Sequence, residues 1–266
     1  DLPTKSEQTD LLQVLFGRNG ESPMPVLAAT SPTDCFEAAF EASKMALEHM
    51  TPVVLLTDAF IANGSAAWKL PVLADYPAIN PPFVPAELKG TWTPYQRNEE
   101  GVRYWAVPGT EGFTHILGGL EKDNATGAIS TNPENHHLMT QLRQQKIDNI
   151  KVPDVVVEGD KDDAELLIVG FGGTYGHLHA AMDDMRAAGK KVALAHFKYI
   201  NPLPKNTEEV LKKYPKVVVA EQNMGQFAGY LRMKIDGFVP SQYNEVKGQP
   251  FVVNELVAAF TEILNK

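Results

Sequence analysis

The first residues of the chain combine a hydroxyl group and a positive charge at the predicted start of a helix. Thr4-Lys5-Ser6-Glu7 has the form of a capping box, in which a hydroxyl caps the helix and a carboxylate follows three residues later. Helix N-termini also attract anions, so Thr4 could donate a hydrogen bond to an anionic substrate and Lys5 could add a positive charge. Capping by Thr4 and plain solvation of Lys5 are the alternatives.

Acidic and amide side chains follow a buried strand farther along the chain. The apolar run 52–56 predicts this strand, and Asp58 and Asn63 come after its carboxyl end, where parallel sheets place their ligands. Both are therefore candidates for cofactor binding, with a turn-forming role as the alternative. Asp123 lies in the glycine-bounded, charged segment 118–127, which predicts an exposed loop. Such a loop can carry function or be an ordinary surface turn.

Cysteine and histidine are too few, or too poorly spaced, for a metal centre. Cys35 is the single cysteine of the sequence, whereas an iron-sulfur cluster normally needs four thiolates. His177 and His179 are two positions apart on a predicted helix, so they point in different directions, and the adjacent His136 and His137 do not make a site by themselves. We expect neither an iron-sulfur cluster nor a cysteine-rich zinc site in this chain.

The segment 170–176, GFGGTYG, leaves a predicted strand and enters a predicted helix. Its glycine spacing differs from that of a dinucleotide-binding fingerprint, and the acidic residue expected about 20 positions later is missing. We therefore expect these glycines to let the strand and the helix pack closely.

The composition excludes several classes of protein. Asp and Glu outnumber Lys and Arg by 33 to 24, and the net charge of -9 disfavours binding to a nucleic-acid backbone. No apolar run approaches the roughly 20 residues that span a bilayer. The lone cysteine cannot form an internal disulfide, and no charged-then-apolar leader precedes the first helix. We expect a cytoplasmic protein with no nucleic-acid partner and no membrane partner.

Strands alternate with helices along the chain, which predicts an α/β fold with parallel sheets and right-handed crossovers. Between residues 68 and 108, seven prolines and three tryptophans predict an irregular but ordered extension. We divide the chain into a first region, 1–150, an acidic linker, 151–164, and a second, doubly wound domain, 165–266.

Three stretches, in this order, resemble the alpha subunits of 2-oxoacid:ferredoxin oxidoreductases. The stretch 2–21 begins with Leu-Pro-Thr and resembles the end of that family's Gly-Pro-Ser-Thr-Gly-Leu-Pro-Thr substrate loop. The second stretch, 52–71, contains PVVLLTD, NGS and WKLP. The third, 172–226, contains GGTYG, AH, NPLP and EQNMGQ. Gly119-Leu120-Glu121-Lys122 and Asn135-His136-His137 suggest the 2-oxoglutarate-type branch of the family.

The resemblance implies a thiamine-diphosphate enzyme of the 2-oxoglutarate synthase type. Such an enzyme decarboxylates 2-oxoglutarate, transfers the acyl group to coenzyme A to give succinyl-CoA, and reduces ferredoxin. Residues 1–150 would be the C-terminal part of a pyrimidine-binding-type domain with an irregular extension, and 165–266 a transketolase C-terminal-like domain. A beta subunit would carry the Mg²⁺ and the iron-sulfur cluster and share the thiamine diphosphate. The expected assembly is a dimer of heterodimers, a heterotetramer.

The same resemblance supports substrate contacts for Thr4, Lys5 and Asp123, while Asp58 and Asn63 stay candidates for cofactor contacts because of their position after the strand. It identifies no catalytic residue here, because the family's glutamate that touches the aminopyrimidine would lie upstream of Asp1. We therefore expect the family pattern to be incomplete at its N-terminal side.

Several alternatives stay open. The motif 221–226 could line a coenzyme A path or a subunit contact, or its asparagine could simply cap a helix. The substrate could be pyruvate or a branched 2-oxoacid, since specificity depends on a few pocket groups. A non-catalytic scaffold or binding module of transketolase-like fold is the alternative from another class.

Overall fold

The computed structural model describes residues 8–266, and the predicted α/β class is confirmed. Helix α1 covers Leu11–Phe16 and ends at Gly17, as its glycine predicts. Leu11 and Leu15 are buried, whereas Phe16 is 52% exposed. The predicted capping box at residues 4–7 lies outside the described residues.

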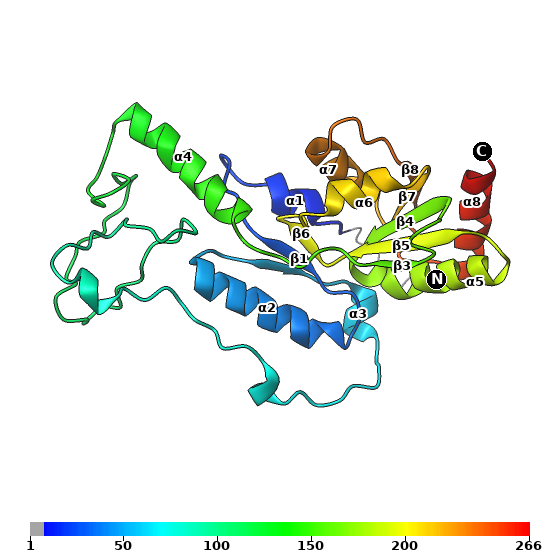
Figure 1. Ribbon diagram of the computed structural model, residues 1–266, viewed down its shortest axis with the longest axis horizontal. Helices are drawn as coiled ribbons and strands as arrows, with labels where there is room; N and C mark the ends of the chain where they lie inside the picture. The colour runs from blue at the N-terminus through cyan, green and yellow to red at the C-terminus, as the bar shows by residue number, and fades with distance from the viewer. Residues whose placement is uncertain (1–7) are drawn as a thin grey trace.

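A small sheet joins the two halves of the chain. Its strand order is β2-β1-β6, with β1 (Val26–Ala28) parallel to β2 (Val54–Leu56) and antiparallel to β6 (Tyr199–Asn201). Helix α2 (Asp34–His49) connects β1 to β2 and lies along the sheet (Figure 1). Since β6 belongs to the predicted second domain and β1 to the first, the two units share a hydrogen-bonded sheet.

A five-stranded sheet forms the second unit, in the order β3-β5-β4-β7-β8. The four strands β5, β4, β7 and β8 are parallel, and β3 pairs antiparallel with β5 at one edge. The strands are β3 (Val157–Gly159), β4 (Leu166–Phe171), β5 (Val192–Phe197), β7 (Val217–Glu221) and β8 (Ser241–Asn244).

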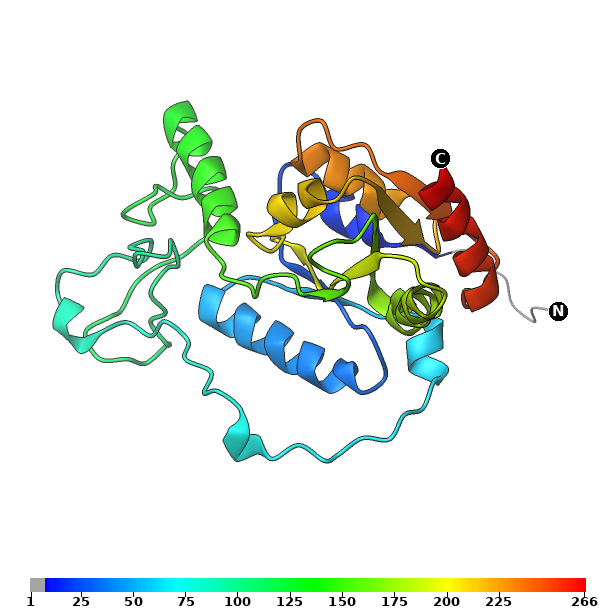
Figure 2. The same ribbon diagram turned by 45° about the vertical axis from the view of Figure 1, so that its right-hand side comes forward.

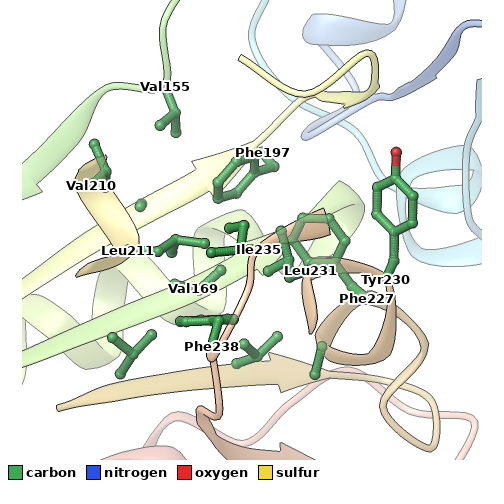
Figure 3. Packing of buried hydrophobic residues seen from close by; sticks show 14 of the residues in the cluster. Val155, Val169, Phe197, Val210, Leu211, Phe227, Tyr230, Leu231, Ile235 and Phe238 are labelled. Atoms are coloured by element: carbon green, nitrogen blue, oxygen red, sulfur yellow. The ribbon is translucent and has the colours of Figure 1, made fainter. Parts of the chain in front are cut away.

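Helices cover both faces of this sheet, as expected for a doubly wound domain. Residues of α5 and α8 form a buried cluster with one face, and residues of α6, α7 and α1 form another with the opposite face. Figure 3 shows this second cluster, where Phe197 and Val169 of the sheet meet Phe227 and Leu231 of α7. The helices are α5 (Tyr175–Ala187), α6 (Thr207–Lys213), α7 (Gln226–Lys234) and α8 (Val253–Asn265).

The segment 151–164, predicted as an acidic linker, contains a short strand. Residues 157–159 form β3, whose register places Val157 opposite Ala195 of β5. Just before it, the backbone N–H and C=O of Val155 both bond to the side chain of Asn206, at 2.9 Å each. The physical reason is that β5 would otherwise be an open sheet edge, and an added strand satisfies its backbone groups.

An irregular extension projects from the small sheet, as its prolines predict. It contains the short 3₁₀ turns Leu73–Asp75 and Ala86–Leu88 and leads into the polar helix α4 (Pro133–Asp148). Its first part runs below α2 from α3, and its later part lies with α4 on the left in both views (Figures 1 and 2). Within residues 8–266 no helix is both long and apolar enough to cross a bilayer.

Candidate functional site

The carboxyl ends of four strands meet at one pocket of about 140 Å³. Because β1, β2, β4 and β7 all end here, residues from both halves of the chain form its walls. The pocket is lined by Gln8, Thr9, Asp10, Leu11, Ala28, Ala29, Leu56, Thr57, Asp58, Phe171, Gly172, Gly173, Thr174, Gln222 and Asn223.

The connections of the large sheet explain why a pocket forms at this edge. Strand β4 lies between β5 and β7, so the chain leaves β4 on one side of the sheet and later returns on the other side to form β7. Open α/β sheets bind ligands at such a reversal of strand order, outside the carboxyl ends of the strands. Gly172, Gly173, Gln222 and Asn223 occupy these ends.

Asp58 lies in the pocket wall and caps helix α3 (Ala59–Asn63). Its Oδ1 accepts the backbone N–H of Ile61 at 2.8 Å, which is the local role that turn chemistry predicts. On its other side the carboxylate presses against the backbone of Gly173, where an added Cβ would lie 1.9 Å from Asp58 Oδ2. Asp58 thereby connects the end of β2 to the end of β4.

Asn63 does not line the pocket. Its Nδ2 donates to the carbonyl of Ala59 at 2.8 Å, and the side chain is exposed. The structure therefore separates the two residues that the sequence predicts together at this strand end.

Of the glycines in segment 170–176, Gly170 lets the strand and the helix pack closely, as predicted, whereas Gly176 has no atom near an added Cβ. A Cβ on Gly170 would lie 2.3 Å from Cδ1 of Leu178 on α5. Next to it, Thr174 donates to the carbonyl of Phe171 at 2.8 Å, and the Nε2 of His196 lies 3.2 Å from the same hydroxyl. Burial lowers the pKa of His196 to about 3, so its ring is neutral at pH 7.

The motif 221–226 caps helix α7 with two different side chains. Asn223 Oδ1 accepts the N–H groups of Gly225 and Gln226 at 2.9 and 2.8 Å. The buried carboxylate of Glu221 accepts those of Phe227 and Ala228 at 2.7 and 2.9 Å. Desolvation raises the pKa of Glu221, and the two backbone hydrogen bonds oppose that rise. The capping interpretation of Asn223 is confirmed.

The side chain of Gln226 extends from this motif to helix α1. Its Oε1 accepts the N–H of Leu12 at 3.0 Å, and its Nε2 donates to the carbonyl of Thr9 at 3.4 Å. Sequence reasoning missed this contact, because 214 residues separate Leu12 from Gln226 and no local pattern encodes it.

The histidines of α5 point in different directions, as predicted. His177 packs against Phe60 with tilted rings, their centroids 4.9 Å apart, and burial lowers the pKa of His177. His179 instead lies between the carboxylates of Glu158 and Asp183, at 3.3 Å from each. In the part of the chain that the structure describes, no cluster of three or more His, Cys, Asp or Glu residues is arranged to hold a metal ion.

Asp123 lies in the extension, whose distal part both views place away from α3 (Figures 1 and 2). Its Oδ1 accepts the N–H groups of Ala125 and Thr126 at 3.0 and 2.8 Å, and hydrogen bonds from Thr126 and then Ala125 lower its pKa. Within this chain Asp123 thus shapes a turn. The neighbouring Lys122, expected in an exposed loop, is buried, and its ammonium donates to the carbonyls of Gly119 and Leu120.

Thr4 and Lys5 lie outside the described residues, so the structure does not place them. The residues that follow them, Gln8 to Leu11, form one wall of the pocket.

The pocket walls suit one ring of a cofactor better than a whole cofactor. Sites that enclose a complete small ligand usually have volumes of about 300–1,000 Å³, whereas this pocket has about 140 Å³. Ala28, Ala29, Leu56 and Phe171 provide apolar surface, and Asp58 provides a carboxylate. Such a combination fits a flat heteroaromatic ring with polar edges, such as the pyrimidine of thiamine diphosphate.

Two family models match the chain. Residues 1–129 match the thiamine-diphosphate-binding domain of pyruvate flavodoxin/ferredoxin oxidoreductases, and residues 164–254 match core domain II of pyruvate:ferredoxin oxidoreductase. The chain belongs to the family of 2-oxoacid:ferredoxin oxidoreductase alpha subunits.

Curated relatives and a solved structure carry the same likeness. The chain is 50% identical to the 2-oxoglutarate oxidoreductase subunit KorA of Mycobacterium tuberculosis, over 96% of this chain and 39% of that protein. It is 29% identical to subunit alpha of 2-oxoacid:ferredoxin oxidoreductase 2 of Aeropyrum pernix, over 99% of this chain and 42% of that protein. The chain thus spans about two fifths of the length of these relatives.

The solved structure is 2-oxoglutarate:ferredoxin oxidoreductase from Magnetococcus marinus with 2-oxoglutarate, coenzyme A and succinyl-CoA bound. The match has a TM-score of 0.88 and 30% identity, and it covers 99% of this chain and 46% of that chain.

Proposed function

We propose that this chain is part of the alpha subunit of a 2-oxoglutarate:ferredoxin oxidoreductase. The proposed reaction converts 2-oxoglutarate and coenzyme A into succinyl-CoA and carbon dioxide. The acyl carbon loses two electrons, which reduce ferredoxin. The observation that carries this proposal is the 50% identity, across nearly the whole chain, to a 2-oxoglutarate oxidoreductase subunit.

Thiamine diphosphate would supply the chemistry that makes the decarboxylated carbon a nucleophile. In this proposal the pocket at the strand ends holds the pyrimidine side of that cofactor. Asp58 would contact it directly, whereas Asn63 is exposed outside this pocket and is not part of the proposed contact. The small volume supports a shared site, in which a beta subunit binds the diphosphate with Mg²⁺ and also carries the iron-sulfur cluster. We further propose a cytoplasmic heterotetramer, a dimer of alpha-beta heterodimers.

Substrate recognition would use residues that precede α1 and residues of the extension. Thr4 and Lys5 would meet the 2-oxoacid, a role supported by the pocket wall that Gln8 to Leu11 form directly after them. Asp123 would contact the substrate from the loop 118–127, which the family resemblance brings towards the active site, while its Oδ1 accepts hydrogen bonds from its own turn.

A comparison of substrates tests the proposal. We expect the reconstituted alpha-beta enzyme to use 2-oxoglutarate at least about tenfold more efficiently than pyruvate or 2-oxobutyrate, measured by reduction of a viologen dye. A preference for pyruvate or for a branched 2-oxoacid would overturn the substrate assignment. No turnover of any 2-oxoacid would favour a non-catalytic scaffold.

A further inference from the structure

Helix α1 begins without a capping hydrogen bond from its own N-cap residue. Asp10 precedes the helix, but its side chain makes no capping bond to the backbone. The first N–H groups of a helix have no partner within the helix and need one elsewhere. Here the amide oxygen of Gln226, in the C-terminal unit, accepts the N–H of Leu12 at 3.0 Å. A distant side chain therefore caps α1.

The same amide holds the chain just before the helix. Gln226 Nε2 donates to the carbonyl of Thr9 at 3.4 Å, so one side chain binds the backbone on both sides of the helix start. Gln226 is itself well fixed, because Asn223 Oδ1 accepts its backbone N–H at 2.8 Å. The anchor thus extends from the end of β7 to residues 9–12.

Packing reinforces this connection. Leu11 and Leu15 of α1 belong to the same buried cluster as Phe227 and Leu231 of α7, although the sequence places α1 in the first region. Residues Gln8 to Leu11 line the pocket at the strand ends. Contacts with α7 of the second unit therefore hold this pocket wall in place, although the wall residues belong to the first region of the sequence.

We infer that Gln226 is a positioning residue for the 2-oxoacid site. It fixes the segment that leads from the proposed substrate residues into α1, and it acts through that backbone rather than by touching the substrate. This inference rests on the proposed function. It gives the motif 221–226 a role that neither a coenzyme A path nor capping of α7 alone describes.

The test compares Gln226→Met with Tyr230→Phe in the full-length subunit. Gln226→Met keeps a long side chain but removes both bonds to the α1 segment. Tyr230→Phe is the matched control, because it removes a single α7 bond, the 3.1 Å bond from the Tyr230 hydroxyl to Asn201, and leaves the ring beside Phe16. We expect hydrogen exchange at the Leu12 amide to become about tenfold faster in Gln226→Met and to stay unchanged in Tyr230→Phe.

The kinetic measurement uses the reconstituted alpha-beta enzyme. We expect Gln226→Met to raise the KM for 2-oxoglutarate about tenfold, with kcat and the KM for coenzyme A changed less than about twofold, and Tyr230→Phe to change none of them. If the Leu12 amide exchanges faster in Gln226→Met but the KM for 2-oxoglutarate is unchanged, the positioning role is wrong. If the Leu12 amide exchanges equally fast in both variants, Gln226 does not hold the backbone at the start of α1. A wild-type complex that turns over no 2-oxoacid would refute the proposed function, whereas the exchange result would still decide whether Gln226 fixes the pocket wall.

Discussion

Thr4 is the residue at which the substrate role and the capping role predict different measurements. Thr4→Val keeps the size of the side chain and removes its hydroxyl. If Thr4 donates to the charged 2-oxoacid, the lost hydrogen bond is worth about 1.5–3 kcal/mol, which lowers kcat/KM about 10- to 150-fold. If the Thr4 hydroxyl only bonds to the nearby backbone, as a cap would, about 1 kcal/mol of stability is lost and substrate affinity stays nearly constant.

The two roles are separated by measuring the melting temperature and kcat/KM of the same reconstituted variant with 2-oxoglutarate, pyruvate and 2-oxobutyrate. A loss confined to 2-oxoglutarate would place Thr4 beside the distal carboxylate. A variant that melts earlier but keeps wild-type efficiency with every acid would reduce Thr4 to a helix cap.

The second prediction for a single residue concerns Glu221. Both of its carboxylate oxygens accept backbone N–H groups at the start of α7. In Glu221→Gln one oxygen becomes an NH₂ group that faces a donor, so we expect a loss of about 1–3 kcal/mol in the free energy of unfolding. Urea unfolding of the chain measures it.

The pH dependence of this loss has a definite sign. Burial raises the pKa of Glu221, so the folded state holds its proton more tightly than the unfolded state does. The Glu221 contribution to wild-type stability is therefore fully present below the unfolded pKa and decreases as the pH rises through the folded pKa. The difference between wild type and Glu221→Gln should shrink as the pH rises. A difference that grows with pH would contradict the raised pKa.

At the scale of elements, Gly173 connects the end of β4 to the cap of α3. A Cβ at this position would lie 1.9 Å from Asp58 Oδ2, so Gly173→Ala must displace the carboxylate that caps α3. We expect a loss of about 1–3 kcal/mol in unfolding free energy. The control is Gly176→Ala in α5, where no atom lies within 4 Å of the added Cβ and helix propensity favours alanine. Equal effects of the two substitutions would refute the close approach of Gly173 to Asp58.

The edge strand β3 sets where the second unit begins. We propose that residues 165–266 fold on their own, and that 151–266 is the more stable fragment because it keeps β3 on the open edge of β5. The 3.1 Å ion pair between Arg186 and Asp160 also survives in the longer fragment. Urea midpoints of the two fragments measure the difference. Equal urea midpoints would show that β3 adds nothing to the stability of the second unit.

The sequence predicts the elements whose pattern is local and apolar. The strands at Val26, Val54, Leu166, Val192 and Val217 and the stripe of buried residues on α5 are in the structure. Strands β3, β6 and β8 were not predictable in this way, because their sequences, VEG, YIN and SQYN, contain no apolar run and they form by pairing with another strand.

The same limit applies to the candidate site. Asp58 was accessible to prediction because ligands gather at the carboxyl ends of parallel strands. Asn63 follows the same strand, but one turn of helix carries it out to the surface. The wall formed by Gln8 to Leu11 depends on Gln226, and only the folded chain brings these residues together.

At the scale of the whole molecule, the pocket is formed by both halves of the chain. β6 pairs with β1, and Gln226 bonds to the backbone of Thr9 and Leu12. Both units therefore contribute to the structure around the strand ends. The pocket offers apolar surface and two carboxylates, Asp10 and Asp58, and the sequence has one cysteine and no Gly-Asp-Gly diphosphate motif. We therefore propose that the complete active site needs a second polypeptide, which would supply the diphosphate site and the iron-sulfur cluster.

The most direct test of this division is to assay the purified chain alone and then with its beta subunit, measuring iron, bound thiamine diphosphate and 2-oxoglutarate-dependent, coenzyme A-dependent reduction of a viologen dye. We predict that the chain alone contains no stoichiometric iron, retains no tightly bound thiamine diphosphate and turns over nothing. With the full-length alpha subunit and the beta subunit together, iron, cofactor and activity should all be present. Stoichiometric iron in the chain alone, or turnover of 2-oxoglutarate without another subunit, would contradict the account.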